Sequence, residues 1–177
     1  MMNVDPVINV AAVAQWGRDS GIYGLMTTRW GWPIAESFHF IGLCLMFGTV
    51  GLFDLRMLGM ARGVQLRALH RLVPYGLGGF AISITTGLLF VMTAPEQYLH
   101  NPAFLIKLSL MLLAGLNMVL FYAIAARTVW LTGADDLPPL RARFFGALSL
   151  LCWLGVITCG RVITAYRPPA YFWCPWC

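Results

Sequence analysis

One stretch of the chain decides the fold: residues 32–53 read WPIAESFHFIGLCLMFGTVGLF. It holds a core of about 20 mainly apolar residues, the length that an α-helix needs to cross roughly 30 Å of hydrocarbon. Because lipid offers no hydrogen-bond partners, such a segment must close its own backbone hydrogen bonds as a helix. Three more stretches of this kind follow, at residues 73–94, 103–126 and 144–165. We therefore expect an all-α protein, a bundle of four transmembrane helices.

The composition agrees with a membrane protein. Hydrophobic residues make up 59% of the 177 residues and charged residues 11%, against about 25% charged in a soluble domain. The net charge of +5 comes from arginines in short loops rather than from one basic face, which argues against a nucleic-acid partner. We expect an interfacial segment at residues 1–30, the four-helix domain at 31–167 and a tail at 168–177.

Basic residues predict the orientation in the membrane. Seven of the 12 Lys and Arg residues lie in the loops after the first and third predicted helices: Arg56, Arg62, Arg67, Arg71, Arg127, Arg141 and Arg143. The opposite side has Arg18, Arg29 and Arg167 in water, with Lys107 and Arg161 near helix ends. Since Lys- and Arg-rich loops stay in the cytoplasm, both termini should be periplasmic, in the inner membrane of a bacterium. The arginines on the cytoplasmic side would then set the orientation of the chain in the membrane.

The N-terminal segment predicts short helices that do not span. Asp5-Pro6 is typical of an N-cap followed by proline at the first helical position, which predicts a helix to Trp16. A second short helix would start at Asp19 or Ser20 and run towards Arg29. Nearby aromatic residues indicate that both lie in the outer interface; the alternative is a docking surface for a partner subunit. The start of the chain lacks the positive region of a signal peptide.

The first predicted helix carries a polar stripe. At 100° per residue, one face within about 80° of arc collects Glu36, His39, Leu43, Met46, Val50, Asp54 and Met57. Ionisable groups at this depth are costly. The Glu36 carboxylate, one turn away, could accept the N–H of His39 and orient the ring as a metal or haem ligand. The alternative is a hydrogen-bonded pair that holds this helix against its neighbours.

Two cations lie near the same ends of later helices. Lys107 and Arg161 can each extend towards water. Arg161 should lie at the depth of Glu36, which predicts an ion pair; alternatively, Arg161 and Lys107 hold an anionic group such as a lipid phosphate, a haem propionate or a quinone headgroup. The candidate ligand or ion-pair cluster is therefore Glu36, His39, Lys107 and Arg161.

Other polar and small residues inside the helices predict packing. Asn117 should hydrogen-bond across helices. A ladder of small residues should let another helix approach closely; it consists of Gly76, Gly79, Ser83 and Gly87. The membrane thiols should act as small apolar fillers; they are Cys44, Cys152 and Cys159. Asp135-Asp136 is typical of a turn.

The positions of the three histidines show whether the bundle has two axial ligands for a haem. A b-type haem in a helical bundle needs two axial ligands at the same depth. His100 should be shallower than His39, and His70 should be solvated in a loop on the opposite side. No second histidine matches His39, which leaves a His–Met pair with Met46 or Met92 as the haem alternative. His39 is likewise the candidate ligand for any metal.

The tail carries a Cys-x-x-Cys pair, Cys174 and Cys177. Such a pair forms a disulfide, exchanges electrons or binds a soft metal. No histidine follows Cys177, so covalent c-type haem attachment is not supported. In an oxidising compartment we expect a structural disulfide, and the surrounding aromatic residues are equally suited to clamping another subunit.

Three segments carry a family resemblance. They are Glu36 to Leu43 (ESFHFIGL) with Gly48, Leu55-Arg56 and Leu58-Gly59 after it, Asn101 to Lys107 with Ala114 to Asn117, and Gly160-Arg161. Over residues 30–167 the chain resembles a family of uncharacterised bacterial four-helix membrane proteins. It is more distantly similar to the membrane domain of the copper-resistance D family, which also places a histidine early in a helix. The resemblance implies the four-helix topology, and it implies no activity because the family has no settled one.

The sequence gives little support to catalysis, since it holds no nucleophile–base set, phosphate loop or paired carboxylates. We expect a non-catalytic integral subunit of a larger respiratory or photosynthetic redox assembly, with membrane lipids and other integral subunits as partners. One alternative is an electron carrier that binds a b-type haem or a quinone near His39, Glu36 and Arg161. The other is copper or proton translocation along the stripe of Glu36, His39 and Asp54.

Overall fold

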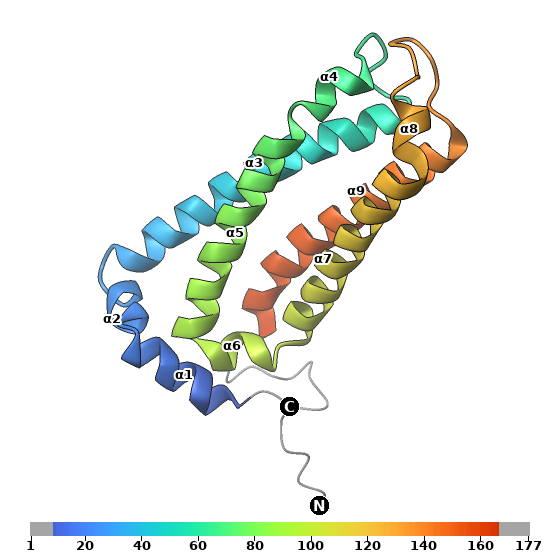
Figure 1. Cartoon of the computed structure of the whole chain (residues 1–177). Helices are drawn as coiled ribbons and strands as arrows, with labels where there is room; N and C mark the ends of the chain where they lie inside the picture. Colours follow the sequence, from blue (N-terminus) through green and yellow to red (C-terminus); the bar gives the residue numbers. More distant parts are fainter. Residues whose placement is uncertain (1–8, 167–177) are drawn as a thin grey trace, which may run out of the picture.

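The computed structural model describes residues 9–166, and the regular structure of this part of the chain is helical, without strands (Figure 1). Its elements are α1 (Val10–Asp19), α2 (Ile22–Met26), α3 (Gly31–Met57), α4 (Leu66–His70), α5 (Val73–Thr93), α6 (Pro95–Leu99), α7 (Pro102–Leu120), the π-helical η1 (Phe121–Ala125), α8 (Ala126–Val129), α9 (Leu140–Val162) and the 3-10 turn η2 (Ile163–Tyr166). The predictions for Asp5-Pro6, Arg167 and the Cys174–Cys177 pair lie outside the described residues.

Four helical segments are long and apolar enough to cross a membrane: Gly31–Met57, Leu66–Thr93, Pro102–Val129 and Leu140–Ala165. The prediction of an all-α chain with four such helices is confirmed. Each segment is a few residues longer than its apolar stretch because the helix continues through the flanking polar positions. The chain is thus a multi-pass membrane protein by the length and composition of its helices.

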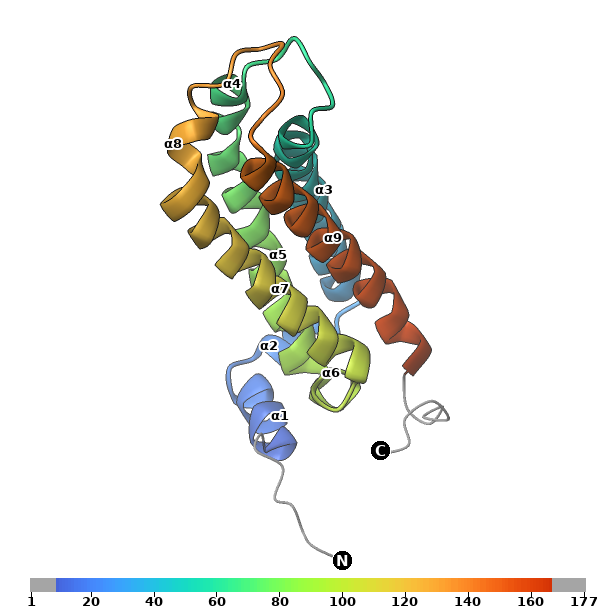
Figure 2. The same ribbon diagram turned by 90° about the vertical axis from the view of Figure 1, so that its right-hand side faces the viewer.

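The four long helices pack as two pairs. α3 lies against α5, α7 lies against α9, and α3 also contacts α9, whereas α5 and α7 hardly touch. Figures 1 and 2 show the pairs running side by side, with α1, α2 and α6 at one end and α4 and α8 at the other. We call these the α6 end and the α4 end. Since α5 and α7 do not close on each other, the bundle interior is open along that side.

Glycines decide how closely α3 and α5 approach. A Cβ on Gly42 would lie 2.6 Å from the Gly79 carbonyl oxygen, and a Cβ on Gly79 would lie 2.6 Å from that of Gly42. Only a residue without a side chain fits at such a crossing. One turn on, the Ser83 hydroxyl donates a hydrogen bond to the His39 carbonyl at 3.4 Å. The predicted ladder on α5 is confirmed, and it positions α5 against the polar stripe of α3.

The α4 end is held together by Arg56, which is 0% exposed. Its Nε donates to the Val64 carbonyl at 2.8 Å. Its Nη2 donates across to the loop before α9, to the carbonyl oxygens of Gly133, Ala134 and Asp136. Arg56 was predicted only to set the orientation of the chain in the membrane. Its guanidinium also joins two loops that are far apart in sequence. The other six arginines of these loops are exposed.

Short helices cover the α6 end. α1 begins at Val10, where the Asn9 side chain accepts a hydrogen bond from the Ala12 N–H at 3.2 Å. Asn9 is thus the N-cap of the described helix, and the predicted start at Asp5-Pro6 lies outside the described residues. α2 begins after Gly21, whose φ of 75° turns the chain, and it is shorter than the predicted segment. Both helices pack against the α5 side of the bundle.

Candidate functional site

Two cavities lie inside the bundle, between the two helix pairs. The Asp54 cavity, nearer the α4 end, has a volume of about 120 Å³, and the His39 cavity, nearer the α6 end, one of about 190 Å³. Each has room for several water molecules, and both are smaller than the roughly 300–1,000 Å³ of a site that encloses a drug-sized ligand. Four residues line both cavities and separate them; we call Met46, Phe80, Met111 and Trp153 the belt.

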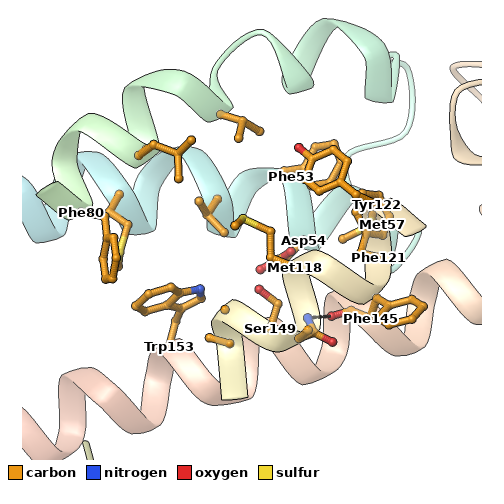
Figure 3. Close-up of a pocket in the computed structure, with 18 of the residues that line it drawn as sticks. Phe53, Asp54, Met57, Phe80, Met118, Phe121, Tyr122, Phe145, Ser149 and Trp153 are labelled. Atoms are coloured by element: carbon orange, nitrogen blue, oxygen red, sulfur yellow. Dashed lines mark hydrogen bonds between the residues drawn. The ribbon is translucent and has the colours of Figure 1, made fainter. Parts of the chain in front are cut away.

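Asp54 is the ionisable residue of the first cavity. Its side chain is 2% exposed although it lies on a membrane-spanning helix, and its Oδ2 has no hydrogen-bond partner in the protein. The Ser149 hydroxyl of α9 points towards this carboxyl group (Figure 3). A buried oxygen without a partner costs about 1–3 kcal/mol. The cavity therefore favours an occupant that donates hydrogen bonds, such as water.

Asn117 adds a second unpaired oxygen to the same cavity. Its Nδ2 donates to the Phe145 carbonyl at 3.0 Å, which joins α7 to α9 and is drawn as a dashed line in Figure 3. The predicted hydrogen bond across helices is confirmed. Its buried Oδ1 has no partner. Two residues that line this cavity, Asp54 and Asn117, thus each have a buried acceptor oxygen without a partner among the described residues.

The π-helical segment η1 connects this cavity to the α4 end. Tyr122, on η1, lines the cavity, and its hydroxyl lies 2.8 Å from His70 Nε2. The His70 ring packs edge-on against Trp130, with the ring centroids 4.6 Å apart. The prediction of a solvated loop histidine was wrong, because α4 folds back and buries half of the ring among aromatic side chains. Such π-helical turns are frequent at functional sites.

His39 lines the second cavity, and its ring is oriented by α5. Its Nδ1 lies 2.8 Å from the Thr86 hydroxyl, and the edge of its ring meets Phe90. Glu36, by contrast, is exposed and makes no hydrogen bond or ion pair with His39. The residue that orients the imidazole is therefore Thr86 and not Glu36, because α5 packs tightly on the inward face of α3.

Lys107 shares this cavity with His39. The side chain is half-buried, and its Nζ lies 3.5 Å from the place where a Cβ on Gly160 of α9 would be. Arg161 and Glu36 are both exposed, do not line the cavity and form no ion pair in the part of the chain that the structure describes. Of the predicted cluster of four residues, the structure brings His39 and Lys107 together and leaves the other two outside.

The structure offers less support for the remaining metal and redox predictions. Within residues 9–166 no three His, Cys, Asp or Glu side chains gather as a metal-ion site. Cys152 is buried, Cys159 half-buried and Cys44 exposed, and all three are free thiols; their role as apolar fillers stays a prediction. His100, at the end of α6, is exposed. The haem prediction stays a prediction, with His39 and Met46 on the wall of one cavity.

Sequence reasoning missed Thr86, Ser149 and Tyr122. A threonine or serine in a membrane helix ordinarily hydrogen-bonds its own backbone, as Thr85 does with the Ala81 carbonyl. Thr86 makes such a bond too, and only the neighbouring helix reveals its second partner. One signal was present: Ser149, Cys152 and Val156 recur at helical spacing and are all buried on α9.

Comparison of the chain with protein-family models, with curated proteins and with solved structures finds no match. The resemblance of residues 30–167 to bacterial four-helix membrane proteins accordingly remains a prediction. The residues that line the two cavities are the features of the protein that bear on its function.

Proposed function

We propose that this chain transfers protons inside a membrane, as an integral subunit of a larger redox assembly. The observation that carries the proposal is Asp54, a carboxyl group buried on a membrane-spanning helix that lines a cavity and has one oxygen without a partner among residues 9–166. Ionisable residues inside a membrane are energetically unfavourable, and series of Asp, Glu and His side chains are the usual proton relays of membrane proteins.

Exchangeable groups continue from Asp54 towards the α4 end. Ser149 and Asn117 border the same cavity, and Tyr122 leads from its wall to His70 at 2.8 Å. Hydroxyl and imidazole groups both accept and donate protons, so water in the cavity would complete a path from Asp54 to His70. This half of the bundle has the chemistry of a proton path that ends at the arginine-rich loops.

The belt divides this path from the His39 cavity. Three of its four residues, Met46, Phe80 and Met111, offer no N–H or O–H donor, so protons pass it only when water enters between the cavities. A dry constriction of this kind gates conduction by its hydration. Transfer through this chain would therefore depend on movements of the helices that admit water between the two cavities.

The membrane and the partners belong to the same proposal. We place the chain in a bacterial inner membrane with periplasmic termini, because six exposed arginines lie at the α4 end, in its loops and in the adjoining helix ends. Trp16 and Trp30, both exposed at the α6 end, suit either the membrane interface or a neighbouring subunit. Gentle solubilisation from the native membrane should yield the chain together with other integral subunits; a chain that is isolated alone would contradict this part.

A proton-flux measurement tests the role of Asp54. The full chain, reconstituted in potassium-loaded liposomes, should admit protons when valinomycin sets a membrane potential. Asp54→Asn keeps the shape but cannot exchange a proton, so we expect a flux at least about tenfold lower. The control is Asp135→Asn in the exposed loop before α9, which should match the wild type. Equal flux for Asp54→Asn and the wild type, or a wild type no faster than empty liposomes, would refute the proposal.

A further inference from the structure

Beyond proton transfer, we propose that the His39 cavity binds the ring of a lipid-soluble quinol, with His39 Nε2 accepting a hydrogen bond from one quinol hydroxyl and Lys107 donating to the other oxygen. The apolar tail would leave the bundle between α5 and α7. The proposal rests on the hydrogen bonds of Thr86, on the position of Lys107 and on the mouth of the cavity.

Thr86 decides which nitrogen of His39 is free. The Thr86 hydroxyl lies 2.8 Å from the Ile82 carbonyl and 3.2 Å from the Ser83 carbonyl, and both of these are acceptors. Its single proton is therefore engaged, and towards His39 Nδ1, at 2.8 Å, the hydroxyl can only accept. Nδ1 must then carry the ring proton. In the neutral ring this makes Nε2 the nitrogen that can accept a hydrogen bond.

Lys107 supplies the complementary donor. Its ammonium group has three N–H donors and no acceptor, and it lines the same cavity as His39. Its Nζ lies beside Gly160 of α9. A cavity with one free acceptor and one cationic donor matches a headgroup that has both a hydroxyl proton and an acceptor oxygen. A quinol has both, whereas an ionised carboxylate or phosphate diester offers acceptors only and leaves Nε2 unmatched.

The walls and the size of the cavity fit one aromatic ring. Phe80, Phe104 and Trp153 line it and can pack edge-to-face or offset against a ring. Its volume of about 190 Å³ exceeds the roughly 150 Å³ of an apolar protein cavity that binds benzene. A long isoprenoid tail would not fit inside, so it must leave through an opening.

That opening faces lipid between α5 and α7. Ile84 and Leu88 of α5 and Leu108 of α7 line the cavity and are at the same time exposed, Leu88 by 56%. Side chains that border a cavity and also the outside mark its mouth, and these three are all aliphatic. Because α5 and α7 hardly touch, a tail can pass between them into the hydrocarbon. A ligand that enters from the membrane interior needs such a route.

Calorimetric titration with short-tailed analogues tests the proposal. Decylubiquinol, decylubiquinone and oleate are titrated into the full chain in lipid nanodiscs. We expect saturable binding of decylubiquinol, and roughly five- to tenfold weaker binding of decylubiquinone, which has no hydroxyl proton for Nε2. Thr86→Val should remove this preference by releasing the His39 ring. Thr85→Val, the same change one residue away on the exposed face of α5, should leave it intact.

Lys107→Gln gives an independent variant in case Thr86→Val fails to fold. This variant should weaken the binding of both analogues by a similar factor, because both present an oxygen to the ammonium group of Lys107. The absence of saturable decylubiquinol binding, equal affinity for the two analogues in the wild type, or oleate binding as tightly as decylubiquinol would each overturn the proposal; the last outcome would assign the cavity to an anionic lipid. Proton flux through Asp54 is measured separately and does not depend on this result.

Discussion

At the scale of single residues, the two buried charged groups of the interior differ in how they are satisfied. Within residues 9–166 each keeps one buried atom without a partner, but Arg56 donates to four backbone carbonyls and lines neither cavity, whereas Asp54 lines a cavity with its Oδ2 unpaired. A guanidinium surrounded by carbonyl groups is typical of a structural clamp. A carboxyl group left incomplete beside a cavity is typical of a functional position. We therefore assign stability to Arg56 and chemistry to Asp54.

The assignment of Arg56 predicts the effect of a conservative substitution. Arg56→Lys keeps the charge but loses the planar fork that reaches both loops, so at least one charge-assisted hydrogen bond is lost. We expect the free energy of unfolding to fall by about 1.5–3 kcal/mol, measured by denaturant titration in detergent micelles. The control is Arg62→Lys, at an exposed position with one hydrogen bond inside its own loop. A change within about 0.5 kcal/mol for both variants would contradict the clamp.

At the scale of elements, contact between α3 and α5 positions the site. The crossing at Gly42 and Gly79 brings the backbones together, and this closeness puts Thr86 within hydrogen-bonding distance of His39. The ladder of small residues on α5 was recognisable from its spacing. Its partner helix was not, because a small-residue face indicates close approach without indicating which helix approaches.

Two adjacent glycines of α5 test this contact. Gly79→Ala places a Cβ 2.6 Å from the Gly42 carbonyl oxygen, so the helices must separate, at a cost of about 1–3 kcal/mol. Gly78→Ala meets nothing within 4 Å and should be neutral or stabilise the helix by up to about 1 kcal/mol. Thermal unfolding in micelles compares the two. Equal midpoints for both variants would show that the crossing contributes little to stability.

At the scale of the whole molecule, the two ends of the bundle differ in character. The α4 end carries the arginine-rich loops, and the α6 end carries the exposed tryptophans of the N-terminal helices and the nearby opening of the His39 cavity. Basic loops are retained in the cytoplasm. The proposed quinol site would then lie nearer the periplasmic face, and the proton path from Asp54 would lead to the cytoplasmic face.

Reporter fusions test this orientation. Alkaline phosphatase is active only after export, and a green fluorescent protein exported unfolded stays dark. A phosphatase joined after Cys177 should therefore be active, and a fluorescent protein at the same position should not fluoresce. A phosphatase inserted in the loop at Gly133, next to the Arg56 clamp, should be inactive. The opposite pattern would reverse the orientation and with it the direction of the proposed path.

The amino-acid sequence by itself determined the four membrane-spanning helices: their number, their approximate bounds and the inward stripe of α3 follow from apolar runs of bilayer length and a period of 3.6 residues. Those signals are local, so they could not tell which helix covers a given face. Only the tertiary structure decided that His39 meets Thr86 rather than Glu36, that His70 is packed among aromatic rings, and that Arg56 joins two loops. Each of these contacts depends on residues distant in sequence, which helical periodicity does not relate.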